Sequence, residues 1–297
     1  MEQARIDGVA LAHEVTGSGE PLLLISIGPI ADSFLPFVSE RALADRHSLI
    51  RYEQRRMDVA ADAPAPVSFA QHAADAAALL RHLGVDRAHV AGHSSGACIA
   101  LQLAVDHPQL VHTLALLEPP LLGVPSGPAF LEQAGPAVAE YAAGHRAEAM
   151  ATFLSMVCSL DWERCRTLVE TRVPGAVARA IANADDFFGS YLPALGAWRF
   201  GAREAAGIAR PVLSVVGSDT ERLFAESHDL LRSWFPQLEA CEIPGTTHLL
   251  HLHHPEPVAR CVAAFLARHP MAAGDRGLRA TLTPPRAALP RSPAPLP

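Results

Sequence analysis

The chain contains one short motif with a strict steric requirement, Gly92-His93-Ser94-Ser95-Gly96. An apolar run that ends at Ala91 precedes it and the small-residue apolar run 97–105 follows it, which predicts a strand, a sharp turn and a helix. The two backbones approach closely at such a turn, so the two glycines supply positions without a side chain. The motif therefore predicts that Ser94 occupies a strained turn and is a catalytic nucleophile.

A serine nucleophile needs a base that takes its proton and a carboxylate that orients the base. His248 follows a Pro-Gly turn after the last predicted strand, and Asp219 follows the strand before it. We therefore predict that Ser94, Asp219 and His248 are the catalytic residues, in the order serine, acid, histidine. Glu118, at the end of an earlier predicted strand, is the rival acid.

Strands and helices alternate in the hydrophobic pattern on both sides of the motif. Predicted strands, the first two joined as a hairpin, lie in 3–16, 21–27, 47–52, 87–91, 111–117, 211–216 and 238–243. Predicted helices lie in 33–44, 68–83, 97–105 and 257–268, and another lies between the last two strands. The alternation predicts a mostly parallel sheet with helices on both faces, whose ligands bind beyond the carboxyl ends of the strands.

The pattern divides the chain into four parts. Residues 1–122 form the first part of the α/β core, and 208–270 complete it. Between them, residues 123–207 have a wholly helical period and hold nine of the 17 aromatic residues, which predicts a helical lid that roofs an apolar pocket. Residues 271–297 carry six prolines and almost no apolar periodicity, so we expect a disordered tail.

Composition excludes several function classes. The net charge of −7, without a basic cluster, argues against nucleic acid or an anionic membrane as a partner. No apolar stretch approaches the length of a membrane span, and the five cysteines are scattered without a Cys-x-x-Cys spacing. We expect buried thiols, a cytoplasmic protein and a small-molecule substrate; a monomer and a homodimer are equally open.

We expect no metal and no cofactor at the site. The histidine-rich stretch 248–254 has no carboxylate or cysteine at a recognised zinc-ligand spacing, and leucines interrupt it. No glycine-rich phosphate loop or dinucleotide fingerprint occurs in the sequence.

With these motifs, residues 3 to 270 resemble the α/β-hydrolase family, in particular its capped bacterial members. The resemblance rests on the motif around Ser94, the Gly-x-Asp ending at Asp219, the Pro-Gly-x-x-His ending at His248 and the run 254–259, His-Pro-Glu-Pro-Val-Ala. It implies an α/β-hydrolase fold with a mostly parallel eight-stranded sheet, a helical lid and an oxyanion hole built from the backbone amides of Gly28 and Ser95.

Two stretches depart from the family pattern. Ser26-Ile27 stands where members usually have His-Gly, and the run 52–56, Tyr-Glu-Gln-Arg-Arg, stands where they have Tyr-Asp-x-Arg-Gly. Because Ile27 is β-branched and Pro29 has no amide, Gly28 is the only unhindered donor of that loop. These departures predict a site that is weakened or reshaped for an unusual substrate.

Three functions are compatible with these residues. The leading hypothesis is a serine hydrolase acting on a carbonyl of a small, largely apolar ester or lactone. The second is a binding module that holds a small ligand with little turnover, and the third is an acyltransferase or cyclase that uses the same triad under a lid that excludes water.

Overall fold

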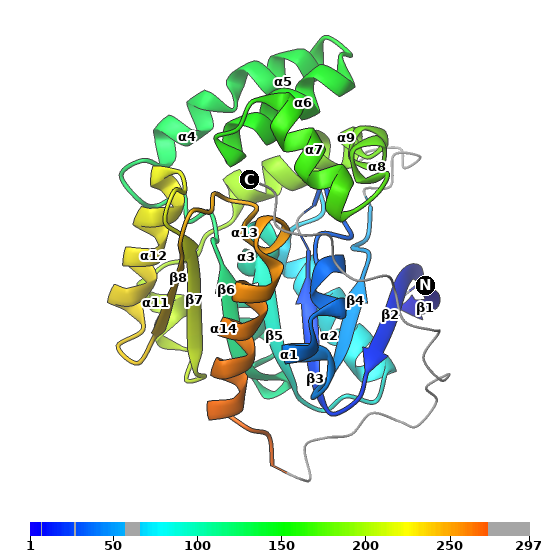
Figure 1. The fold of residues 1–297 in the computed structure, drawn as a ribbon, viewed down its shortest axis with the longest axis vertical. Coiled ribbons are helices and arrows are strands. Elements are labelled where there is room, and N and C mark those ends of the chain that lie inside the picture. The colour runs from blue at the N-terminus through cyan, green and yellow to red at the C-terminus, as the bar shows by residue number, and fades with distance from the viewer. Residues whose placement is uncertain (7, 27, 57–65, 273–297) are drawn as a thin grey trace.

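A computed structural model describes residues 1–6, 8–26, 28–56 and 66–272 of the chain. Its strands form one eight-stranded sheet in the order β1-β2-β4-β3-β5-β6-β7-β8 (Figure 1). The strands are β1 (Glu2–Ile6), β2 (Val9–Gly17), β3 (Glu20–Ile25), β4 (His47–Tyr52), β5 (Ala88–His93), β6 (Val111–Leu117), β7 (Val212–Gly217) and β8 (Glu239–Ile243). The sheet confirms the predicted fold class.

The pairing of the strands follows the predicted alternation. β1 and β2 form an antiparallel hairpin, β2 pairs antiparallel with β4, and every later neighbouring pair is parallel. The turn between β1 and β2 includes position 7, which lies outside the described residues. The central strands β3, β5 and β6 are almost wholly buried, as their continuous apolar runs predict.

Helices cover both faces of the sheet. On one face α2 (Phe69–His82) packs against α3 (Ser95–Asp106), and on the other α1 (Arg41–Ala44) packs against α14 (Pro255–Arg268). The Ser68 hydroxyl caps α2 by accepting a hydrogen bond from the backbone N–H of Gln71 at 3.1 Å. α12 (Arg222–Trp234) contacts β7, which lies next to the edge strand β8.

All described elements between β6 and β7 are helical. The first six, up to residue 186, lie over the carboxyl ends of the strands, whereas the last lies beside α12 (Figure 1). They are α4 (Gly127–Gln133), α5 (Gly135–Ala142), α6 (Arg146–Cys158), α7 (Trp162–Arg172), α8 (Ala176–Ala182), α9 (Ala184–Asp186), the π-helix η3 (Phe187–Tyr191), α10 (Leu192–Ala197) and α11 (Ala202–Ala206). We call this segment the lid. No described helix is long and apolar enough to cross a membrane.

The structure corrects three local expectations. The helix expected over 33–44 is a 3-10 turn, η1 (Leu35–Ser39), followed by the single-turn α1, because Glu40 adopts an extended conformation between them. A further short helix, α13 (Leu250–His253), follows the last strand. Cys241 and Cys261 form a disulfide, whereas the other three cysteines are buried thiols as expected.

The expected tail begins later than the pattern suggested. Met271 is buried, and its N–H donates a hydrogen bond to Glu20 Oε1 at 3.1 Å, so this residue belongs to the folded body. The remainder of the predicted tail, 273–297, lies outside the described residues.

Candidate active site

Ser94 lies between β5 and α3, at the carboxyl edge of the sheet. Its backbone has φ 54° and ψ −126°, a strained conformation for a residue with a side chain. A Cβ added to Gly92 would lie 2.4 Å from the Gly96 carbonyl oxygen, and one added to Gly96 would lie 2.2 Å from that of Ile25. The two glycines are therefore required by close backbone contacts, and the turn has the geometry that the motif predicts.

Ser95 is the first residue of α3 and is buried beside Ser94. Its N–H is among the first four of the helix, which have no acceptor within the helix. The helix dipole also places positive potential at this end. The Ser95 amide is therefore placed where it can stabilise negative charge that develops next to Ser94.

His248 forms a buried pair with Glu118. The Nδ1–H of His248 donates to Oε2 of Glu118 at 2.7 Å, and both side chains are almost completely shielded from solvent. The carboxylate follows β6 and the imidazole follows β8, so the sheet brings together residues 130 positions apart. The bond holds the proton on Nδ1 and leaves Nε2 of His248 as the basic nitrogen.

The Glu118 carboxylate is fixed by the neighbouring strand. Its Oε1 atom accepts a hydrogen bond from the N–H of Gly217 at 2.8 Å. Glu118 also has a positive φ of 48°, which is uncommon for a residue with a side chain and marks a second strained position at this edge. Burial raises the pKa of Glu118 to about 7 and lowers the pKa of His248 to about 3, since it disfavours the charged form of each group.

Asp219 does not occupy the position that the sequence analysis assigned to it. Its side chain is exposed, and its Oδ1 atom accepts a hydrogen bond from the neighbouring Ser218 hydroxyl at 2.7 Å. Its backbone N–H donates to the Thr246 carbonyl. The contact with His248 is made by the rival carboxylate of Glu118, which is buried after β6, whereas the Asp219 carboxylate lies in an exposed loop and bonds to Ser218.

Two aromatic residues hold the His248 ring and backbone in place. The ring of Phe224, on α12, stacks on the imidazole with 3.8 Å between the ring centroids and an interplanar angle of 9°. His93, the residue before Ser94, donates a hydrogen bond from Nε2 to the His248 carbonyl at 2.8 Å. The strand that carries the serine is thus joined directly to the loop that carries the histidine.

Ser94 and His248 line the same cavity beneath the lid, which has a volume of about 40 Å³. Most of the other lining side chains are apolar and come from the lid and from α12: Phe130, Phe153, Leu154, Val157, Phe187, Tyr191, Leu192, Leu195 and Phe224. This volume has room for only a few water molecules and is far below that of an ordinary ligand pocket. A substrate therefore requires the lid side chains to move.

The loop after β3 lies directly beneath the lid. A Cβ added to Gly28 would lie 2.7 Å from Cγ of Tyr191, so the aromatic ring of η3 rests on this glycine. Pro29, the next residue, lines the cavity with Ser94. The Gln54 amide donates to the Ser26 carbonyl at 2.9 Å, and position 27 lies outside the described residues. The predicted role of the Gly28 amide remains a prediction.

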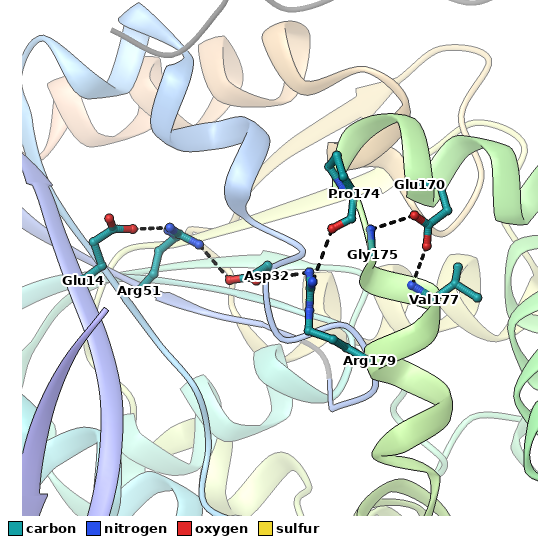
Figure 2. A network of polar contacts seen from close by, with 8 residues as sticks. All are labelled: Glu14, Asp32, Arg51, Glu170, Pro174, Gly175, Val177 and Arg179. Carbon is teal, nitrogen blue, oxygen red and sulfur yellow. Dashed lines mark hydrogen bonds and ion pairs between the residues drawn. The ribbon is translucent and has the colours of Figure 1, made fainter. Parts of the chain in front are cut away.

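An ionic network fixes this loop to both the core and the lid (Figure 2). Asp32 accepts a hydrogen bond from Arg51 of β4 at 3.0 Å and one from Arg179 of α8 at 3.4 Å. Arg51 also donates to Glu14 of β2. Within the lid, Glu170 accepts the backbone N–H groups at the start of α8 (Figure 2). Asp32 therefore joins the loop beside the cavity to a lid helix.

Comparison with known proteins supports the fold and its general class. The family model of the alpha/beta hydrolase fold matches residues 30–255. A protein named as a carbamate hydrolase, RutD, of Azorhizobium caulinodans is 35% identical over 108 residues, which cover 36% of this chain and 40% of the relative. The rhodomycin D methylesterase DnrP of Streptomyces peucetius is 39% identical over 121 residues, covering 37% of this chain and 39% of the relative. The aligned segments thus span about 40% of these curated relatives.

Solved structures extend the likeness to almost the whole chain. The enol-lactonase of Burkholderia xenovorans LB400 has a TM-score of 0.73 at 18% identity, and the match covers 90% of this chain and all of that one. A thermophilic esterase of Thermogutta terrifontis also has a TM-score of 0.73, at 19% identity, covering 91% of this chain and all of that one. Together with the matched family model, the sheet and the turn at Ser94, these likenesses show that the chain belongs to the α/β-hydrolase fold family.

Proposed function

We propose that this protein is a serine hydrolase that cleaves a small, largely apolar ester or lactone. The observation that carries the proposal is that a strained serine and a buried histidine–carboxylate pair meet at one cavity. Ser94 and His248 both line the cavity, and Glu118 is hydrogen-bonded to His248. A buried histidine that donates its Nδ1 proton to a carboxylate is the arrangement that activates a serine nucleophile.

Each residue has a defined step in the proposed reaction. Ser94 Oγ attacks the substrate carbonyl while Nε2 of His248 takes its proton, and Glu118 stabilises the imidazolium that forms. The amide of Ser95 stabilises the oxyanion, and Gly28 is the proposed second donor. His248 then protonates the leaving alcohol. Water deprotonated by His248 attacks the acyl-enzyme, so that the acid product leaves and Ser94 regains its proton.

The lining of the cavity supports the substrate class. Aromatic and aliphatic side chains of the lid and α12 surround Ser94, and they offer few polar partners to a bound acyl group. Because the lid side chains must move to admit any acyl group, a compact acyl group requires less movement than a long chain and is favoured. Relatives and structural neighbours include proteins named as a methylesterase, an esterase and an enol-lactonase, which are all classes of acyl-oxygen hydrolysis.

A panel of nitrophenyl esters with acyl chains of increasing length tests the proposal. We expect turnover of short-chain esters and a fall of kcat/KM as the chain lengthens. Ser94→Ala and His248→Ala should each remove nearly all turnover, because the members of a triad act as a unit. Equal turnover by wild type and Ser94→Ala in the folded protein would refute the mechanism.

The loop after β3 favours a second candidate, a binding module with little turnover, because the Tyr191 ring rests on Gly28, the proposed second oxyanion donor. The cavity of about 40 Å³ admits neither a substrate nor a ligand of this class until the lid side chains move, so its volume does not separate the two candidates. A module of this kind would bind small apolar carbonyl compounds, measured by calorimetry, yet hydrolyse none of the esters in the panel. Hydrolysis of any ester in the panel at a rate typical of an enzyme would exclude the binding module.

A further inference from the structure

A second cluster of polar side chains lies at the opposite end of the sheet from Ser94. Glu20, His47 and His89 stand at or near the amino ends of β3, β4 and β5. Residue pairing places Glu20 beside His47, and Leu22 beside His89. One potential ligand atom from each of the three residues lies within 4.8 Å of the other two. Within the described ranges no other three histidine, cysteine, aspartate or glutamate residues come together in this way.

We propose that Glu20, His47 and His89 bind a zinc ion. Two imidazoles and one carboxylate are a common three-ligand set for Zn²⁺. Ligand atoms about 2.0–2.1 Å from a tetrahedral zinc stand roughly 3.3 Å apart, and Nε2 of His89 lies 3.1 Å from Oε2 of Glu20. The two separations that involve His47 are at most 4.8 Å, so its ring and the other two side chains would have to draw together by up to about 1.5 Å on binding.

In both His47 and His89 the hydrogen bond at Nδ1 favours zinc binding through Nε2. Nδ1 of His47 donates to the Leu43 carbonyl at 3.1 Å, which leaves Nε2 of the neutral ring unprotonated. Nδ1 of His89 lies 2.8 Å from the Thr113 hydroxyl oxygen, which can accept a hydrogen bond from a protonated Nδ1. On zinc binding the His89 proton moves from Nε2, where it faces Glu20, to Nδ1, where it faces Thr113, so the ring stays neutral. Burial of both rings favours this neutral, metal-binding form.

The cluster opens to solvent on one side. Glu20 and His47 line a cavity of about 740 Å³ between α1 and the end of α14, with Asp45, Arg46 and Pro270 among its other walls. This cavity supplies an entry path and room for water as the fourth ligand. Glu20 also accepts the Met271 N–H, so a bound ion would join three strands to the chain segment after α14. The site is independent of the catalytic proposal.

Titration of the full chain with ZnCl₂ in a calorimeter tests this proposal. We expect one equivalent of zinc to bind to wild type and to raise its melting temperature. Cobalt should give the intense visible absorption of a four-coordinate ion. His47→Gln and Glu20→Gln should each weaken zinc binding by at least about tenfold. The control is His145→Gln, which changes an exposed histidine that bonds to Glu140 and should leave binding unchanged.

Three results would overturn the proposal. They are no stoichiometric binding to wild type, binding that both Glu20→Gln and His47→Gln leave unchanged, and equal weakening by His145→Gln. Because loss of a buried side chain can impair folding, wild-type crystals soaked in ZnCl₂ give an independent measurement. An anomalous difference peak between Glu20, His47 and His89 is expected, and a zinc peak at the 248–254 stretch alone would contradict it.

Discussion

Nδ1 of His248 lies 2.7 Å from Oε2 of Glu118, in a pair that joins the end of β6 to the loop after β8. From this relationship we expect Glu118→Gln to lower kcat by roughly 10³–10⁴-fold, because a neutral amide neither fixes the imidazole tautomer nor stabilises the imidazolium. Asp219→Asn, at an exposed carboxylate, is the matched control and should change kcat by less than about threefold. Steady-state kinetics on both variants decides the assignment. The opposite ranking would return the acid role to Asp219.

The buried pair also predicts the pH dependence of catalysis. Burial raises the pKa of Glu118 to about 7, and a protonated Glu118 donates to Nδ1 of His248 and forces the proton onto Nε2. The base is then lost, so kcat/KM should rise with pH and level off above about 7. In Glu118→Gln the remaining activity should not fall as the pH drops below about 7. The carboxyl that titrates there is gone, and burial alone keeps the pKa of His248 low. The same fall of kcat/KM at low pH in wild type and in Glu118→Gln would show that Glu118 is not the titrating group.

The contact between Gly28 and Tyr191 predicts strong coupling between the loop after β3 and the lid. A Cβ at position 28 would lie 2.7 Å from the Tyr191 ring, so Gly28→Ala should lower kcat/KM by more than about tenfold. Adding the same change to Tyr191→Ala should cost much less, which a double-mutant cycle measures. Gly123→Ala, with open space around its Cβ, is the control. Additive effects of the two substitutions would show that the ring does not restrain the loop.

The network at Asp32 predicts a role in holding the lid. Asp32→Asn weakens the contacts with the buried Arg51 and with Arg179 of α8, so we expect a loss of about 1–3 kcal/mol in the free energy of unfolding. Amide hydrogen exchange in α8 should become faster than in wild type. Asp45→Asn removes an exposed pair with Arg41 and should change neither measurement. Unchanged exchange in Asp32→Asn would show that the lid is held elsewhere.

The parts of the fold that could be predicted are those where the backbone geometry restricts which residue types fit. The continuous apolar strands and the glycines around Ser94 have few alternative structures, because buried parallel strands and close backbone contacts impose those residue types. The single helix predicted over 33–44 was wrong, since periodicity alone does not reveal the extended backbone at Glu40. The disulfide between Cys241 and Cys261 was missed because their proximity depends on how α14 packs beside β8.

The acid could not be chosen from sequence for a similar reason. Asp219 and Glu118 both follow buried strands, and only the folded sheet shows which carboxylate is buried against His248. The one local signal was the position of Glu118 directly before two prolines, which end the strand at that point. The cluster of Glu20, His47 and His89 had no sequence signal at all, because its members come from three strands and share no spacing motif.

The most direct test of the proposed mechanism is covalent labelling with a fluorophosphonate, followed by peptide mass spectrometry. A nucleophile activated by His248 should carry one adduct per chain, located on Ser94. Ser94→Ala should remain unlabelled, and Glu118→Gln should be labelled much more slowly than Asp219→Asn. An unlabelled wild-type protein, or an adduct that persists in Ser94→Ala, would contradict the assignment of Ser94 as the nucleophile.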